Sequence, residues 1–194
     1  MRALTDYLET AELEALLQII DRTRDRLLVR FLFESGCSIS EAAAIHTEAL
    51  ASDGTLALQG RTVIISADLA RALKENAGTC LFSTRQTTTI TPKRIQQILK
   101  PYLSQIHNGK TTPHVLRYTH IIHAYKQGVP IRAISNQTGL TSVRVAQIVA
   151  NIPSPKRYAF QSPLGINATS ARNASNTHTI ERARIAARKR GGKT

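Results

Sequence analysis

The chain has 194 residues, of which 42% are hydrophobic, and its 26 Lys and Arg against 13 Asp and Glu leave a formal net charge of +13. This hydrophobic content suffices for a packed core and excludes wholesale disorder. No apolar run reaches the roughly 18 residues of a spanning helix, and the first residues are acidic where a signal peptide is basic, so we expect a cytoplasmic protein that does not enter a membrane. Cys37 and Cys80 are too few for a disulfide framework or a zinc site, and we expect both to be reduced and buried.

Charge is divided unevenly along the chain. Residues 1–75 hold 8 basic and 12 acidic residues, whereas residues 76–194 hold 18 basic residues and a single acid, Glu181. A surface this basic attracts polyanions, and the commonest polyanion in the cytoplasm is nucleic acid. The alternative is a charged surface that only keeps the protein soluble, but such surfaces usually mix both signs. We therefore expect double-stranded DNA as the partner and a location at the nucleoid.

The first half of the chain shows helical periods followed by a short β pattern. A first helix is predicted with Thr10 as its N-cap, a second over 26–34 with Gly36 at its end, and a third over 41–45 with Ser40 as its N-cap. Two runs rich in β-branched residues, 55–59 and 61–65, predict a hairpin around Gly60. A helix over 67–76 follows, and residues 79–83 suggest an edge strand or an extended loop.

The second half is predicted to be helical up to residue 152. The expected helices cover 92–103, 112–127, 130–137 and 140–152, with Gly139 in the turn between the last two. Beyond Pro155 the composition shifts to Ser, Asn, Thr and Ala with a basic run near the end, which is typical of a flexible tail. We therefore expect a domain over 1–155, mainly α with a small antiparallel β-sheet, and a basic, mostly flexible tail over 156–194.

Two short motifs point to a chemistry. The first is Gly36-Cys37-Ser38-Ile39-Ser40-Glu41, and the second is His114-Val115-Leu116-Arg117. Together with the order of helices, the hairpin and the final glycine-turned helix pair, they resemble the catalytic domain of the tyrosine recombinases, the phage integrase family, over roughly residues 4–152. That family carries the patterns G-x-R-x-S-E and H-x-L-R. The resemblance implies a tyrosine-recombinase-like fold and a site that holds a DNA phosphate.

The sequence departs from the family pattern at several active-site positions. The first catalytic arginine of the family falls on Ser38, its histidine or tryptophan on Leu140, and its nucleophilic tyrosine on Val149. Valine has no nucleophilic oxygen, and the loss of one charged donor removes about 3 kcal/mol of transition-state stabilisation. A counterpart of the family's hairpin lysine is not evident at 58–61. Only His114 and Arg117 remain as catalytic remnants.

These departures lead us to expect that the chain is not an enzyme. The main hypothesis is a catalytically inactive tyrosine-recombinase-like protein that binds double-stranded DNA, as a transcriptional regulator or as an accessory factor of a mobile element or plasmid. One alternative is an atypical active recombinase or integrase that uses Tyr158 or a partner's tyrosine as nucleophile. Another is a plasmid replication or maintenance protein.

His114, His120 and His123 could suggest a metal, but their spacing on one helix does not bring together a tetrahedral set, so we expect neither a metal nor a cofactor. Residues 131–149 also fit a helix-turn-helix, a pattern that any two packed helices with a glycine turn can produce.

Two interpretations are open for Arg117: it contacts a DNA phosphate, or it has a structural role in bridging two helices. The expected DNA-binding residues are Arg61, Lys93, Arg94, His114, Arg117, Arg144, Lys156, Arg157, Arg182, Arg184, Arg188, Lys189 and Arg190.

The resemblance also bears on how DNA is held. Full-length relatives usually carry a DNA-clamping domain before the catalytic one, whereas this chain begins almost at the catalytic region. We therefore expect affinity to come from one face, from the basic tail or from oligomerisation. In the family the segment beyond the tyrosine often docks on a neighbour, so residues 156–170 are a possible contact between copies of the chain.

Overall fold

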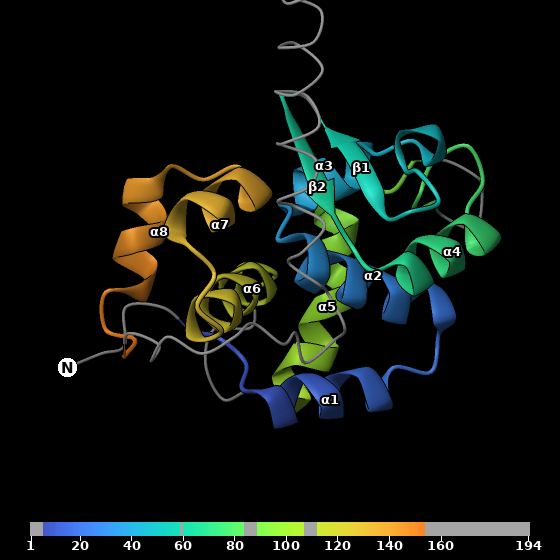
Figure 1. The fold of residues 1–194 in the computed structure, drawn as a ribbon. Coiled ribbons are helices and arrows are strands. Elements are labelled where there is room, and N and C mark those ends of the chain that lie inside the picture. Colours follow the sequence, from blue (N-terminus) through green and yellow to red (C-terminus); the bar gives the residue numbers. More distant parts are fainter. Residues whose placement is uncertain (1–5, 59, 84–88, 107–111, 154–194) are drawn as a thin grey trace, which may run out of the picture. The chain divides into compact units, whose positions relative to one another are not determined.

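A computed structural model describes residues 6–58, 60–83, 89–106 and 112–153 (Figure 1). Among these, the prediction of a mainly α fold with a small antiparallel sheet is confirmed. The elements are α1 (Thr10–Ile19), α2 (Thr23–Ser35), α3 (Ile39–Ala44), the 3₁₀ helix η1 (Thr47–Ala49), β1 (Thr55–Leu58), β2 (Arg61–Ile64), α4 (Ala67–Asn76), α5 (Pro92–Ile106), α6 (His114–Lys126), α7 (Ile131–Thr138) and α8 (Ser142–Val149).

Helix α2 lies at the centre of the larger apolar core. Its residues are apolar on nearly all sides, and Leu28, Val29 and Phe31 are fully buried. It packs against α1, α4, α5 and α6, so elements far apart in the sequence meet on this one helix (Figure 1). Glycine ends α2 as predicted: Gly36 adopts a left-handed φ of 63° and donates its N–H to the Leu32 carbonyl.

A second apolar cluster joins α6, α7 and α8. Ile122 of α6, Ile134 of α7 and Val145 of α8 are buried in it. The inward and outward faces of the last two helices agree with their hydrophobic period, since Arg144 and Gln147 are exposed. The α7–α8 pair therefore packs on α6 as a unit of its own.

The N-terminal caps of α1 and α3 differ from the predictions. Glu9 rather than Thr10 caps α1, in a capping box with Glu12. Ser38 rather than Ser40 caps α3: its hydroxyl accepts the Glu41 N–H at 3.2 Å, while the Glu41 carboxylate accepts the Ser38 N–H at 2.8 Å. The reason is the spacing, because a serine three residues before a glutamate satisfies two helix-start N–H groups at once.

The predicted hairpin is confirmed as a two-stranded antiparallel sheet. Its register pairs Thr55 with Ile64 and Leu58 with Arg61. Residues 79–83 form no regular strand, only isolated bridges such as that between His46 and Cys80. The expectation for the cysteines is only half right, because both are free but only Cys37 is buried.

All described residues belong to one unit that spans Met1–Tyr158. The predicted tail over 156–194 lies outside the described residues, so its flexibility and the boundary at residue 155 stay predictions. Among the described helices, none combines the length and the apolar character needed to cross a membrane.

Candidate nucleic-acid interface

The H-x-L-R motif opens α6. His114 is the first helical residue and is exposed, and Arg117, one turn further on, is half-buried. Residues three apart lie on the same side of a helix, so both side chains belong to one face at the N-terminal end of α6. The His114 ring stacks on Tyr118 with centroids 6.3 Å apart. Tyr118 was not among the predicted site residues, although its position four residues after His114 pointed to this contact.

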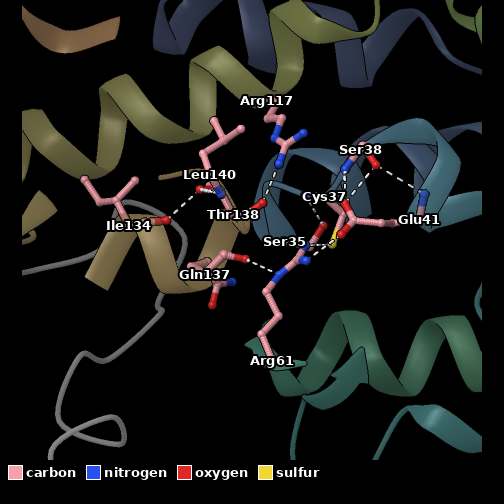
Figure 2. A network of polar contacts seen from close by, with 10 residues as sticks. All are labelled: Ser35, Cys37, Ser38, Glu41, Arg61, Arg117, Ile134, Gln137, Thr138 and Leu140. Carbon is pink, nitrogen blue, oxygen red and sulfur yellow. Dashed lines mark hydrogen bonds and ion pairs between the residues drawn. The ribbon is translucent and has the colours of Figure 1, made fainter. Parts of the chain in front are cut away.

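Arg117 is only partly engaged by the protein. Its Nη2 donates to the main-chain carbonyl of Thr138, which ties α6 to the end of α7 (Figure 2). Its Nε is buried and has no hydrogen-bond partner among the described residues. Burial lowers the pKa of the Arg117 guanidinium; the charge of Glu41 opposes this shift and that of Arg61 adds to it. Arg117 thus bridges two helices and still has an unused donor.

Arg61, one of the expected DNA-binding residues, turns inward from the hairpin. Its Nη1 forms an ion pair with the Glu41 carboxylate at 2.5 Å, and its side chain is only 17% exposed. Its Nε donates to the Gln137 carbonyl at 3.4 Å, and its Nη2 lies 3.8 Å from the Cys37 sulfur. The first residue of β2 therefore reaches α3 and α7 together (Figure 2).

Glu41 holds the Arg61 guanidinium against the start of α3. One oxygen of its carboxylate faces Arg61, and the other accepts the N–H and the hydroxyl of Ser38, each at 2.8 Å. Burial raises the pKa of the Glu41 carboxyl, but the bonds from Arg61 and Ser38 outweigh burial and leave the pKa below its usual range. The carboxylate is therefore charged and fully used near neutral pH.

The end of α7 meets both guanidiniums. Arg61 and Arg117 donate to the carbonyls of two consecutive residues, Gln137 and Thr138. The helix ends at Gly139 with φ of 71°, and a Cβ built there would lie 2.5 Å from the Arg61 Nη1. A glycine is therefore required both for the left-handed turn and for the approach of Arg61. The carbonyl end of a helix carries partial negative charge, which favours cations here.

The positions that depart from the family pattern are packed into the fold. Val149 is 3% exposed and belongs to the apolar cluster of α6, α7 and α8. Leu140 is half-buried and packs on the same cluster. Ser38 is the N-cap of α3, and its hydroxyl accepts the Glu41 N–H. A nucleophile cannot come from position 149, and Tyr158 lies outside the described residues.

Other predicted DNA-binding residues are exposed on separate helices. Lys93 and Arg94 lie near the start of α5, and Arg144 lies in the first turn of α8. Arg94 donates to Gln97 and Arg144 donates to Gln147, in each case three residues further along. The remaining predicted residues lie outside the described residues: Lys156, Arg157, Arg182, Arg184, Arg188, Lys189 and Arg190.

The other histidines of α6 face the protein interior. The His120 ring packs against Gly36 and meets the Phe33 ring edge to face, and the His123 Nε2 is hydrogen-bonded to the Leu8 carbonyl at 2.9 Å. Within the described ranges, no group of three His, Cys, Asp or Glu side chains is arranged to hold a metal ion.

The family model described as "Phage integrase family" matches residues 6–152, and the chain belongs to this family. Tyrosine recombinase XerC of Roseiflexus sp. (strain RS-1) is 27% identical over 173 residues, which cover 78% of this chain and 55% of that protein. Tyrosine recombinase XerA of Pyrococcus furiosus is 27% identical over 169 residues, which cover 78% of this chain and 59% of that protein. The chain thus spans little more than half the length of these relatives.

Solved structures show the same fold. The crystal structure of XerA recombinase matches with a TM-score of 0.68 at 20% identity and covers 92% of this chain and 65% of that one. The XerH site-specific recombinase bound to palindromic difH substrate, a post-cleavage complex, also matches with a TM-score of 0.68, at 18% identity over 77% of this chain and 51% of that one. The predicted tyrosine-recombinase-like fold is confirmed.

The comparisons contradict our expectation that the chain is not an enzyme. The relatives that it matches are named tyrosine recombinases, which is the name of an enzyme class. That expectation rests on Ser38, Leu140 and Val149. Those residues exclude only their own participation in the chemistry, because another side chain can supply a missing group. The findings therefore favour the alternative hypothesis, an atypical recombinase.

Proposed function

We propose that this chain acts in site-specific DNA recombination, with the phosphate of a DNA strand bound at Arg117 and the nucleophilic tyrosine supplied from outside position 149. The observation that carries the proposal is the half-buried Arg117 guanidinium with its unpartnered Nε at the N-terminal end of α6. A buried donor left unpaired costs about 1–3 kcal/mol, and an oxyanion removes this cost on binding. The partial positive charge at a helix start adds to the attraction for phosphate.

The relatives and the charge support DNA as the substrate. The XerH and lambda integrase structures are described as bound to their DNA sites. The excess of basic residues after position 75 and the exposed Lys93, Arg94 and Arg144 would add backbone contacts outside the Arg117 site. These contacts position a duplex without reading its sequence.

The nucleophile is the distinctive part of the proposal. A tyrosine oxygen would form a bond to the phosphorus while the bond from phosphorus to one deoxyribose oxygen breaks, which leaves a protein–DNA phosphodiester and a free hydroxyl on the strand. Reversal with a different strand hydroxyl rejoins the DNA. Since Val149 has no hydroxyl and is buried, the candidates are Tyr158, nine residues further on, and a tyrosine of a partner subunit.

A covalent adduct tests this proposal directly. The full chain is incubated with a pool of nicked duplexes of random central sequence, so that a cleaved fragment diffuses away and the adduct is trapped, and the products are separated under denaturing conditions. We expect a protein–DNA adduct that is lost in Tyr158→Phe and kept in Tyr102→Phe, a matched change on α5. If DNA binds but no pool yields an adduct, the recombinase proposal is wrong.

A mixing experiment separates the two sources of tyrosine. An Arg117→Ala chain keeps its tyrosines but lacks the phosphate ligand, and a Tyr158→Phe chain keeps the ligand. If the tyrosine acts on the site of another copy, the mixture forms adduct on the Arg117→Ala chain although neither variant does so alone. If it acts within its own copy, the mixture stays inactive.

Regulation of transcription, an accessory role on a mobile element and plasmid maintenance all stay predictions. Sequencing of DNA crosslinked to the protein in its host tests them together, because a regulator is expected at a few promoters, a recombinase at its recombination site and a maintenance protein at plasmid repeats.

A further inference from the structure

We propose that Arg61, at the start of β2, is the second phosphate-binding arginine of this site and does what Ser38 cannot do. This inference rests on the proposed function of the Arg117 site. Arg61 stands 23 positions after Ser38 in the sequence but lies beside the first motif in the fold.

Both arginines are anchored at the same helix end. Arg61 donates to the Gln137 carbonyl and Arg117 to the Thr138 carbonyl, so their guanidiniums lie at consecutive residues of α7. Figure 2 shows the two side chains extending toward one another from β2 and α6, with the end of α7 beside them. Two forked cations in such proximity match the several oxygens of one phosphate.

The charged groups around the two arginines favour the binding of an anion. The two guanidiniums lie near a single carboxylate, that of Glu41. One oxygen of this carboxylate pairs with Arg61, and the other accepts the N–H and the hydroxyl of Ser38. Burial raises the pKa of the Cys37 thiol, so this nearby group stays neutral near pH 7. The site therefore keeps a net positive charge, and an anion between the two arginines would reduce their mutual repulsion.

The present contacts of Arg61 are weak apart from the one with Glu41. Its bond to the Gln137 carbonyl is long, at 3.4 Å, and its contact with the Cys37 sulfur is 3.8 Å. Its side chain is 17% exposed, so a DNA phosphate can approach it without unfolding the hairpin. Gly139 has no Cβ to block the space beside the guanidinium. Arg61 is thus held in place and still has donors to offer.

Glu41 has a defined part in this arrangement. It is a positioning residue that orients Arg61 in the absence of DNA and competes with phosphate for the guanidinium. Removing its charge should therefore strengthen anion binding, whereas a purely structural ion pair predicts only a loss of stability. The phosphate affinity of a Glu41 variant therefore distinguishes a positioning residue from a purely structural one.

The experiment follows the arginine Nε–H signals of the ¹⁵N-labelled full chain during titration with inorganic phosphate at constant ionic strength. We expect the Arg61 and Arg117 signals to shift together with one dissociation constant. Arg61→Gln should weaken phosphate binding at least fivefold at Arg117, and Glu41→Gln should strengthen it severalfold. Arg71→Gln, an exposed change on α4, is the matched control and should leave the dissociation constant for phosphate at Arg61 and Arg117 unchanged.

The outcomes are distinguishable. If phosphate shifts Arg117 equally in the wild type, Arg61→Gln and Glu41→Gln, the inference about Arg61 is wrong while the Arg117 site stands. If Arg117 does not respond in any chain, the phosphate site of the proposed function fails as well. Thermal unfolding is measured for each variant, and if Arg61→Gln does not fold, the Glu41→Gln result decides: unchanged or weaker phosphate binding overturns the inference.

Discussion

Gln137 and Ile64 are joined by two hydrogen bonds that connect α7 to β2. The side-chain amide of Gln137 accepts the Ile64 N–H at 3.1 Å and donates to the Ile64 carbonyl at 2.7 Å. The main-chain carbonyl of Gln137 accepts from Arg61. One residue thus pairs with the free edge of the hairpin and also presents a carbonyl to the arginine at the other end of the strand.

Replacing this amide should loosen the site. Gln137→Ala removes both bonds to Ile64, together with a long bond from the amide to the Glu34 carbonyl, and leaves the Ile64 backbone groups unpaired. We therefore expect a loss of about 1–3 kcal/mol of unfolding free energy. Duplex binding should also weaken severalfold, because the end of α7 carries contacts of both arginines. Chemical denaturation and a duplex titration measure the two effects, and Gln96→Ala, an exposed change on α5, is the control. Equal results for the two variants would show that the pair is unimportant.

Arg117 should contribute to DNA affinity through charge. We expect Arg117→Ala to weaken duplex binding tenfold or more and to reduce the slope of log affinity against log salt by about one, as for the loss of one phosphate contact. Arg117→Lys should recover part of the affinity, since it keeps the charge but not the forked geometry. Binding isotherms at several salt concentrations test this. Unchanged binding together with lowered stability would identify Arg117 as a helix-bridging residue only.

Gly139 should tolerate alanine less well than Gly128. Both glycines have positive φ, 71° and 83°, so each substitution costs about 1 kcal/mol for the backbone. Only at Gly139 does the new Cβ also meet a neighbour, the Arg61 guanidinium, whereas nothing lies within 4 Å at Gly128. We expect greater destabilisation and weaker phosphate binding for Gly139→Ala. Identical behaviour of the two variants would mean that Arg61 moves aside without cost.

Stability should fall in mild acid because of His120. Burial, assisted by the charges of Arg117 and His123, lowers the pKa of His120 to about 4, despite its hydrogen bond to the Phe33 backbone. The unfolded chain takes up this proton below about pH 6.5, so the stability due to the neutral ring is complete above that pH and is lost as the pH falls toward 4.

The corresponding measurement compares unfolding free energies at pH 7 and pH 5. We expect the wild type to lose on the order of 2 kcal/mol more than His120→Gln between these values, from the shift of this one group. Burial also lowers the pKa of His123, so the variant should retain part of the pH dependence. The same pH dependence in both chains would contradict the assignment to His120.

Restoring a tyrosine at position 149 should not create a nucleophile there. Val149 is 3% exposed among the apolar residues of α6, α7 and α8, so Val149→Tyr overpacks this cluster and should cost about 1–3 kcal/mol. We expect no more DNA adduct from this variant than from the wild type. An increase would show that a side chain at position 149 can reach the phosphate, in contradiction to its burial.

Local patterns were enough to predict most of the helices. The apolar period of α2, the glycine at its end and the β-branched runs of the hairpin depend on neighbours in the sequence, and the structure agrees with them. The caps of α1 and α3 were displaced by one and two residues, because each helix start had more than one polar residue able to cap it. The capping-box spacing of Ser38 and Glu41 was the signal that distinguished them.

The sequence by itself determined the family, the order of elements and the basic second half, because these depend on composition and on short motifs. Only the tertiary structure decided the contacts of Arg61. It faces Glu41 and the end of α7 because the hairpin crosses beside both, and no spacing in the sequence encodes this contact. The burial of Val149 was decided in the same way, by packing between three helices. Motifs report residues that are close along the chain, whereas a binding site is assembled from residues that folding brings together.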